Sequence, residues 1–118
     1  MDIRVTENVD FVTLNLRGRL DLASSSHMKD QVLRLVSEGK SKIILNMAQV
    51  DFINSSGLGT LVSVLKEIRL AKGKMVLSNL ASYVQEIFEI TQLSNIFEIY
   101  NSEADAQEVF LAPAARNR

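Results

Sequence analysis

The feature of this sequence that most constrains its fold is a strand, a helix and a second strand in direct succession. Within residues 42–47, residues 43–45 form an unbroken apolar run, which is typical of a central strand covered on both faces. Residues 75–77 form a second apolar run. Because a crossover of this kind is right-handed and makes its two strands parallel, we predict a helix lying across a sheet. The apolar stripe of that helix comprises Leu58, Leu61, Val62, Leu65 and Ile68.

The sequence before this unit predicts two more strands and a helix. Apolar and polar residues nearly alternate over residues 3–18, with a turn near residues 8–10. A serine-rich segment begins at Ser24, and apolar residues at helical spacing continue from there to a closing Gly39. With these first strands beside the parallel pair, the sheet is predicted to be mixed.

The remaining segments complete an α/β layer architecture. Residues 48–54 are assigned to a loop, and residues 96–100 are compatible with a short last strand. A further helix is expected from Ser102, and residues 82–85 have the pattern of a capping box that opens another. We therefore predict about four helices over a mixed sheet of four or five strands. The helix after the capping box is expected to turn inward Val84, Ile87, Phe88 and Thr91.

The length of the chain suits a single domain. Its 118 residues, 47% of them hydrophobic, can bury a core without help from disulfides or metals. We predict one domain over residues 1–112 and an unpacked, disordered C-terminal tail over residues 113–118. The free protein is expected to be a monomer without a cofactor or metal.

Composition and charge disfavour several classes of function. The absence of cysteine excludes a disulfide scaffold, a thiolate zinc site and a cysteine nucleophile, and it fits a cytoplasmic protein. The formal net charge of −1 provides no broad positive field for nucleic acid. The first residues lack the build of a signal peptide, and no apolar stretch approaches the roughly 20 residues of a membrane span, so no membrane attachment is expected.

The most informative segment is residues 51–59, in which two serines precede two glycines at the start of the central helix. The serines are Ser55 and Ser56, and the glycines are Gly57 and Gly59. Each glycine weakens a helix by about 1 kcal/mol relative to alanine, so another requirement must favour it. Close approach of another molecule is one such requirement. On spacing alone, the favoured interpretation of either serine is a plain helix cap.

Enzymatic arrangements fit this segment poorly. A hydrolase elbow has the order Gly-x-Ser-x-Gly, whereas the order here is Ser-Ser-Gly-Leu-Gly. The one histidine, His27, lies in the first turn of the first predicted helix and is expected to be a surface residue rather than a base. A Walker loop would carry lysine where Thr60 stands. Without a convergent acid, base and nucleophile, we expect no catalysis.

Residues 50–59, Val-Asp-Phe-Ile-Asn-Ser-Ser-Gly-Leu-Gly, resemble the signature of STAS domains, specifically the bacterial anti-sigma-factor antagonists. Residues 18–21 resemble the early Gly-x-Leu-Asp element of that family, and the predicted element order is similar to the family's over essentially the whole chain. The resemblance implies a STAS-like fold and a partner switch. In such a switch the unphosphorylated protein binds an anti-sigma factor that is also a serine kinase, and phosphorylation by that ATP-dependent kinase ends the binding.

The resemblance also implies which residues form the site. Ser55 is the implied phosphorylation site, with Ser56 as the less used neighbour, and a metal-dependent serine/threonine phosphatase would reset the switch. For Asp21 two roles stay open: it orients the acceptor hydroxyl or nearby amides, or it caps the first helix. The implied partner-binding residues are Asp21, Asn54, Ser55, Ser56, Gly57 and Gly59.

Two positions depart from the family pattern. Asn54 and Asn46 stand where aspartate is usual, and both changes are expected to remove negative charge beside the phosphorylation site. They either ease the accumulation of phosphate charge or indicate a kinase that recognises a different surface. A second function also stays open, namely a constitutive, non-catalytic STAS subunit of a transport or other signalling complex.

Overall fold

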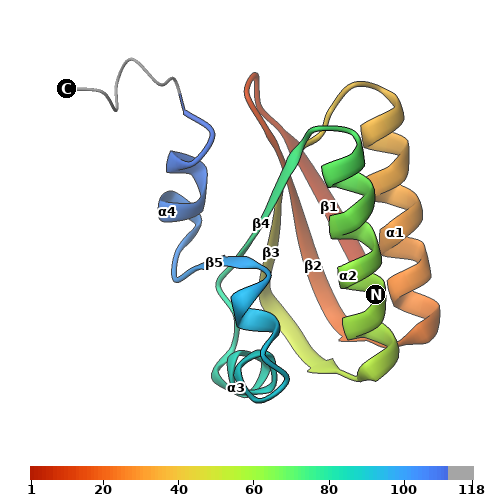
Figure 1. Cartoon of the computed structure of the whole chain (residues 1–118), viewed down its shortest axis with the longest axis vertical. Helices are drawn as coiled ribbons and strands as arrows, with labels where there is room; N and C mark the ends of the chain where they lie inside the picture. Colours follow the sequence, from red (N-terminus) through yellow and green to blue (C-terminus); the bar gives the residue numbers. More distant parts are fainter. Residues whose placement is uncertain (112–118) are drawn as a thin grey trace.

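The computed structural model describes residues 1–111 and arranges them as a sheet with helices on both faces (Figure 1). The predicted tail over residues 113–118 lies outside the described residues. In chain order the elements are β1 (Asp2–Glu7), β2 (Val12–Leu20), α1 (Leu22–Ser37), β3 (Lys42–Ile53), α2 (Ser55–Leu70), β4 (Lys74–Ser78), α3 (Ser82–Ile90), a 3-10 turn (Leu93–Asn95), β5 (Glu98–Tyr100) and α4 (Glu103–Glu108).

The five strands lie in the order β1-β2-β3-β4-β5. β1 runs antiparallel to β2, and every other pair of neighbours is parallel. Each parallel pair is joined through a helix: α1 connects β2 to β3, α2 connects β3 to β4, and α3 connects β4 to β5. The predicted α/β architecture is therefore confirmed, with a mixed sheet of five strands and four helices within the described residues.

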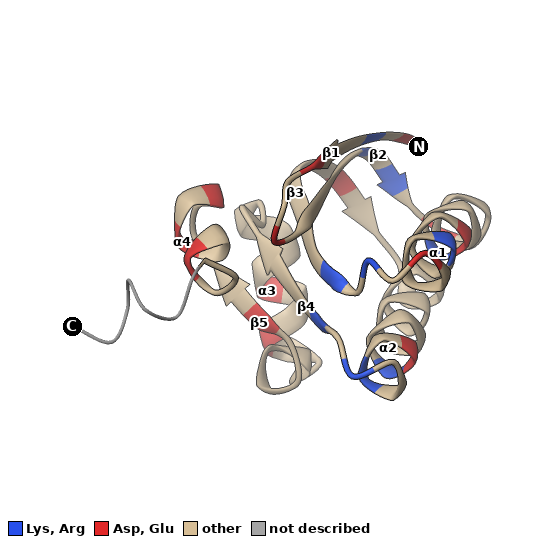
Figure 2. Ribbon diagram, turned by 90° about the horizontal axis from the view of Figure 1, so that it is seen from above, with Lys and Arg blue, Asp and Glu red and all other residues tan. Residues whose placement is uncertain are grey.

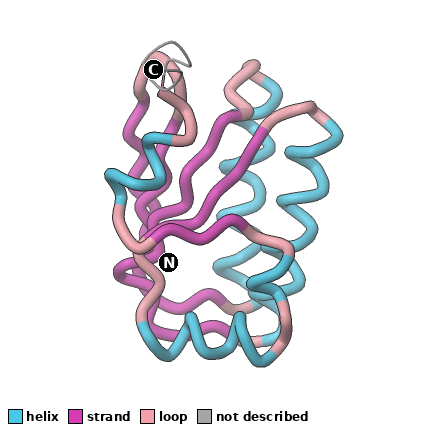
Figure 3. Tube along the Cα trace, turned by 60° about the vertical axis from the view of Figure 1, so that its left-hand side comes forward, coloured by secondary structure: helices cyan, strands magenta, loops and turns pink. Residues whose placement is uncertain are grey.

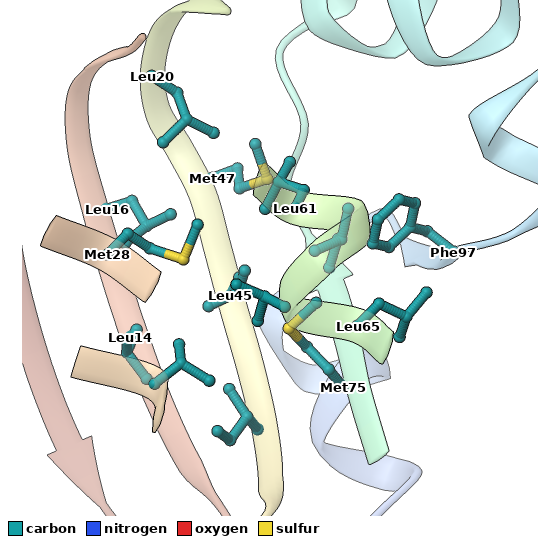
Figure 4. Packing of buried hydrophobic residues seen from close by; sticks show 14 of the residues in the cluster. Leu14, Leu16, Leu20, Met28, Leu45, Met47, Leu61, Leu65, Met75 and Phe97 are labelled. Carbon is teal, nitrogen blue, oxygen red and sulfur yellow. The ribbon is translucent and has the colours of Figure 1, made fainter. Parts of the chain in front are cut away.

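The larger part of the core lies between the sheet and α1, α2 and α3. Met28 of α1, Leu16 of β2, Met47 of β3 and Leu61 of α2 are fully buried members of one cluster (Figure 4). We call this side of the sheet the near face. The sequence builds it by alternation, because Leu14 and Leu16 point inward while their polar neighbours on β2 point away.

The opposite side of the sheet, the far face, is covered only in part. Phe11, Ile44 and Val76 form a second cluster there with Ala106 and Phe110, which α4 and the turn after it supply. Figure 3 shows helices on both sides of the strands. The ends of β1, β2 and β3 that lie beyond α4 consequently leave polar side chains of this face open.

One element differs clearly from its prediction, because residues 48–53 of the predicted loop belong to a strand. β3 continues through Ile53 and stays paired with β2 to its end, where Leu20 lies opposite Ile53. Register shifts interrupt this pairing twice, between Asn15 and Arg17 and between Gly18 and Arg19. Such bulges break the two-residue alternation of apolar and polar side chains. The sequence of the second half of β3 therefore lacks the pattern that predicts a strand.

The helix ends show one success and two errors. α1 closes at Gly39 as predicted, and the φ of +84° at this residue favours glycine. The predicted capping box of α3 is wrong, since Ala81 is the N-cap, without a side-chain bond, and Ser82 is already helical. Thr91 does not point inward; it is exposed after the helix, and its hydroxyl donates to the carbonyl of Ile87.

Two smaller observations complete the fold. The last strand is shorter than predicted, and Ile96 precedes it with 43% of its surface exposed. Among residues 1–111, no helix combines the length and the apolarity that crossing a membrane requires.

Candidate functional site

The candidate site lies where two neighbouring parallel strands end. β2 ends at Leu20 and β3 at Ile53, which lie opposite each other, and a single residue then leads into α1 or α2 (Figure 1). These residues are Asp21 and Asn54, and the backbone N–H of Asn54 donates to the carbonyl of Leu20 at 3.4 Å. Two helix N-termini are thus placed side by side at the carboxyl edge of the sheet.

Asn54, not a serine, caps α2. Its side-chain oxygen accepts a hydrogen bond from the backbone N–H of Gly57 at 3.0 Å, and its carbonyl accepts from Leu58. The interpretation of Ser55 or Ser56 as the cap is therefore wrong. Both are helical residues of the first turn, Ser55 exposed and Ser56 half-buried, and neither hydroxyl is bonded to a described residue.

Asp21 caps α1 in the same way, and a reciprocal bond to the Ser24 side chain completes a capping box. Its carboxylate accepts from the backbone N–H of Ser24, and the Ser24 hydroxyl accepts from the backbone N–H of Asp21. The bond from the Ser24 backbone lowers the pKa of Asp21 from its ordinary 3.8, and the Ser24 hydroxyl and the charge of Arg19 act in the same direction. Of the two roles left open, Asp21 performs the capping role, and no bond joins it to Ser55 among the described residues.

A chain of hydroxyl groups links the two helix starts. Ser25, which is fully buried, lies 3.1 Å from the Thr60 hydroxyl, and Thr60 donates to the carbonyl of Ser56 at 3.0 Å. Sequence reasoning missed this pair. The sequence shows only that Ser25 is a small polar residue on the inward side of α1. Nothing in the sequence predicts that its hydroxyl contacts α2.

The two glycines of the site have different surroundings. A Cβ added to Gly57 would lie 2.2 Å from the carbonyl oxygen of Leu20, because the first turn of α2 presses against the end of β2. Gly59 is exposed and has nothing within 4 Å of such a Cβ. The close approach at Gly57 is therefore made by the chain itself, and only Gly59 presents open surface.

Asn46 lies elsewhere, and its expected position beside the phosphorylation site is wrong. It stands in the middle of β3, where its side-chain amide donates to Glu103 of α4 at 2.8 Å. Thr13 and Gln107 donate to the same carboxylate. An aspartate at position 46 would place a second negative charge against Glu103, so the asparagine serves the packing of α4 on the far face.

The chemistry available at this edge is that of a surface hydroxyl. His27 is exposed on α1, and the described residues contain no group of three or more histidine, aspartate or glutamate side chains suited to a metal ion. The first N–H groups of α2 have no carbonyl partner within the helix and carry partial positive charge. The arrangement can therefore present a hydroxyl to a partner and can accommodate an anion on it.

Comparison with known proteins gives a consistent result. The sequence model of the STAS domain matches residues 1–106. BtrV of Bordetella bronchiseptica, provisionally an anti-sigma factor antagonist, is 30% identical over 95 residues, which cover 80% of this chain and 82% of that protein. The anti-sigma-B factor antagonist of Listeria monocytogenes is 30% identical over 100 residues, which cover 83% of this chain and 86% of the relative.

Solved structures show the same fold. A Thermotoga maritima protein, provisionally an anti-sigma factor antagonist, superposes with a TM-score of 0.86 and 26% identity over 93% of this chain and 95% of its own. SpoIIAA of Bacillus in its phosphorylated form has a TM-score of 0.71 and 20% identity over 91% of this chain and 97% of its own. At this lower identity the likeness concerns the fold alone.

Proposed function

This chain belongs to the STAS domain family, and from that premise we propose that it is an anti-sigma-factor antagonist switched by phosphorylation of Ser55. Unphosphorylated, it binds an anti-sigma factor that is also a serine kinase. That kinase transfers the γ-phosphoryl group of ATP to the Ser55 hydroxyl, releasing ADP, and the complex dissociates. A metal-dependent serine/threonine phosphatase hydrolyses the phosphoserine and restores binding. The protein itself acts in the cytoplasm by binding and catalyses nothing.

The observation that carries the proposal is the state of the Ser55 hydroxyl. It is exposed and bonded to no described residue, at the start of a helix whose cap is provided by Asn54. A kinase can reach such a group without unfolding the helix. Ser56, the less used neighbour, is half-buried and therefore less accessible.

The helix N-terminus explains why the phosphorylated form can stay folded. Phosphate adds about −1.5 to −2 charges at neutral pH and three acceptor oxygens. The unpaired N–H groups of the first turn and the helix dipole both favour an anion at that place. Because Asn54 is neutral, the cap beside Ser55 adds no repulsion to the new charge.

The same phosphate would weaken a complex formed on this edge. Exposed Gly59 allows close approach to the helix, and Leu22, 67% exposed at the start of α1, offers apolar contact area on the same edge. Gly57 contributes by shaping this surface from below, since it is buried. A partner fitted to a hydroxyl would have to face a dianion, which commonly costs about 2–5 kcal/mol, or at least about thirtyfold in affinity.

The test uses the anti-sigma kinase that copurifies with the unphosphorylated protein. After incubation with Mg²⁺ and ATP, intact-mass measurement should show one added phosphoryl group in the wild type and in Ser56→Ala, and none in Ser55→Ala. Ser26→Ala is the matched control, because Ser26 is an exposed serine in the first turns of α1 whose hydroxyl is already bonded to the carbonyl of Leu22. It should be phosphorylated like the wild type.

Binding measured by titration calorimetry completes the test. Ser55→Asp should weaken the complex at least about thirtyfold, and treatment of the phosphorylated protein with the phosphatase should restore wild-type affinity. Equal phosphorylation of Ser55→Ala would contradict the assignment of the acceptor. A Ser55→Asp variant that binds as tightly as the wild type would contradict the switch and favour the constitutive subunit considered above.

A further inference from the structure

The far face of the sheet contains an open polar surface that the proposed function does not use. α4 covers the part of this face formed by Phe11, Ile44 and Val76. Beyond it, β1 and the second halves of β2 and β3 expose a shallow hollow of about 510 Å³. The polar side chains that line the hollow come from Asp2, Arg4, Asn15, Arg17, Asn46 and Gln49.

Three arginines are aligned on this surface. Arg17 and Arg19 alternate on β2 with the inward Leu16 and Leu20, so their side chains leave the sheet on the far face. Arg4 of β1 pairs with Asn15, which places it diagonally across from Arg17. Figure 2 shows the corresponding basic colouring on β1 near the N-terminus and towards the end of β2.

Within residues 1–111 these guanidinium groups form no ion pair, although the charge of Arg19 acts on Asp21 and Asp2 lies opposite Arg17 in the sheet. All three residues are exposed, and none makes an ion pair or a side-chain hydrogen bond with a described residue. Arg19 lies over the ring of Phe52, with its guanidinium carbon 3.9 Å from the ring centroid. That stacking orients the group while its donors remain available.

We propose that this arginine surface, formed by Arg4 and Arg17 in the lining of the hollow and by Arg19 further along β2, binds an acidic peptide segment of a protein partner. A guanidinium fork matches a carboxylate with two parallel hydrogen bonds. The amides of Asn15 and Gln49, which line the hollow between the charged groups, suit the alternating donors and acceptors of a peptide backbone. The surface faces away from α1 and α2, so it is a second docking surface and does not depend on Ser55.

Charge distribution favours carboxylates over phosphate polymers or lipids as the ligand. Asp2 lies opposite Arg17 in the sheet, and Asp51 is exposed on β3. The chain has a net charge of −1. A phosphate backbone or an anionic membrane would spread its charge over these acids as well, whereas a short acidic peptide can confine its carboxylates to the three arginines.

The test titrates the full chain with a peptide of ten glutamates. Binding is measured through the amide chemical shifts of the protein, at low and at physiological salt. The shifts should move at Asn15, Arg17 and Gln49, and the affinity should fall with salt. The variant with Arg4→Gln, Arg17→Gln and Arg19→Gln should bind about tenfold more weakly. A control with Arg34→Gln, Lys42→Gln and Lys66→Gln removes the same charge from other exposed positions, and its affinity should change less than about twofold.

Each other outcome would overturn the proposal. Equal weakening in both triple variants would show that net charge alone attracts the probe, and shifts confined to α1 or α2 would place binding elsewhere. A ten-nucleotide single strand or phosphatidylserine vesicles that bind more tightly, and lose binding in the arginine variant, would assign the surface to phosphates. The single variants Arg4→Gln and Arg17→Gln leave the stacking of Arg19 on Phe52 intact, and each should weaken binding. Unchanged affinity in both would contradict the proposal, even if the triple variant were unfolded.

Discussion

The starts of α1 and α2 occupy equivalent places at the ends of parallel strands, yet they use their serines in opposite ways. Asp21 and Asn54 cap the two helices with the same type of bond to the third residue. In α1 the hydroxyls of Ser24 and Ser26 donate to backbone carbonyls, and the hydroxyl of Ser25 lies 3.1 Å from both the Leu22 carbonyl and the Thr60 hydroxyl. In α2 the hydroxyls of Ser55 and Ser56 are bonded to no described residue. A serine near a helix start is therefore structural or available according to what else secures the turn.

What secures the first turn of α2 is a backbone contact. Gly57 allows the turn to press against the carbonyl of Leu20, and Thr60 ties the carbonyl of Ser56 to Ser25. These contacts and the Asn54 cap replace the serine bonds that hold α1. Ser55 can then carry a phosphoryl group without any loss of a bond that the fold requires.

The largest effect is expected from Gly57→Ala, which would break the contact that distinguishes α2. The new methyl group would meet a backbone oxygen at 2.2 Å, and backbone cannot move aside as a flexible side chain does. We expect the free energy of unfolding, measured with urea, to fall by about 3 kcal/mol. Gly59→Ala is the matched control; it meets nothing within 4 Å and should stabilise the helix by up to about 1 kcal/mol. Similar losses in both variants would show that the approach to Leu20 is not special.

A smaller effect is expected from Asn54→Ala, which removes the cap that leaves Ser55 available. The backbone N–H of Gly57 would lose its acceptor, at a cost of about 1 kcal/mol in the free energy of unfolding. Asn54→Asp keeps an acceptor oxygen and should stay within about 0.5 kcal/mol of the wild type. If Asn54→Ala proved harmless, one of the serines would be able to cap α2, and the contrast between the two helix starts would weaken.

The serines themselves provide a closer comparison. Ser24→Ala removes the bond that the Ser24 hydroxyl accepts from the Asp21 backbone and the bond that it donates to the Arg19 carbonyl, and should cost about 0.5–1 kcal/mol. Ser55→Ala removes no bond and should change the free energy of unfolding by less than about 0.5 kcal/mol. Urea titration of the unphosphorylated proteins measures both. A loss in Ser55→Ala as large as that in Ser24→Ala would mean that the hydroxyl of Ser55 is engaged in the fold.

The elements that could be predicted from the sequence are those with regular hydrophobic periodicity. The strand, helix and strand from β3 to β4 followed from the run at residues 43–45 and the stripe on α2. The second half of β3 did not, because its bulges interrupt the alternation. At the site, residue types alone could not decide between a serine and Asn54 as the cap, since both are good caps. The position of Asn46 against Glu103 depends on how α4 packs across the sheet, a contact 57 residues apart in the sequence.

The smallest effect concerns pH, and it separates the two caps by their charge. The pKa of Asp21 is lowered on folding by the bond from the Ser24 backbone, so its contribution to stability is complete above the ordinary value of 3.8 and is lost as pH falls through the lower pKa of the folded state. Asn54 does not titrate. The stability advantage of the wild type over Asp21→Asn, measured by urea unfolding at successive pH values, should therefore shrink as pH falls below 3.8. The difference in the free energy of unfolding between the wild type and Asn54→Ala, measured in the same way, should show no such decrease. Asn54→Asp should introduce the same pH dependence at α2, because it places a titrating acceptor on the backbone N–H of Gly57. If the wild type and Asp21→Asn instead lose stability in parallel as pH falls, the Asp21 carboxylate does not stabilise α1 through its charge.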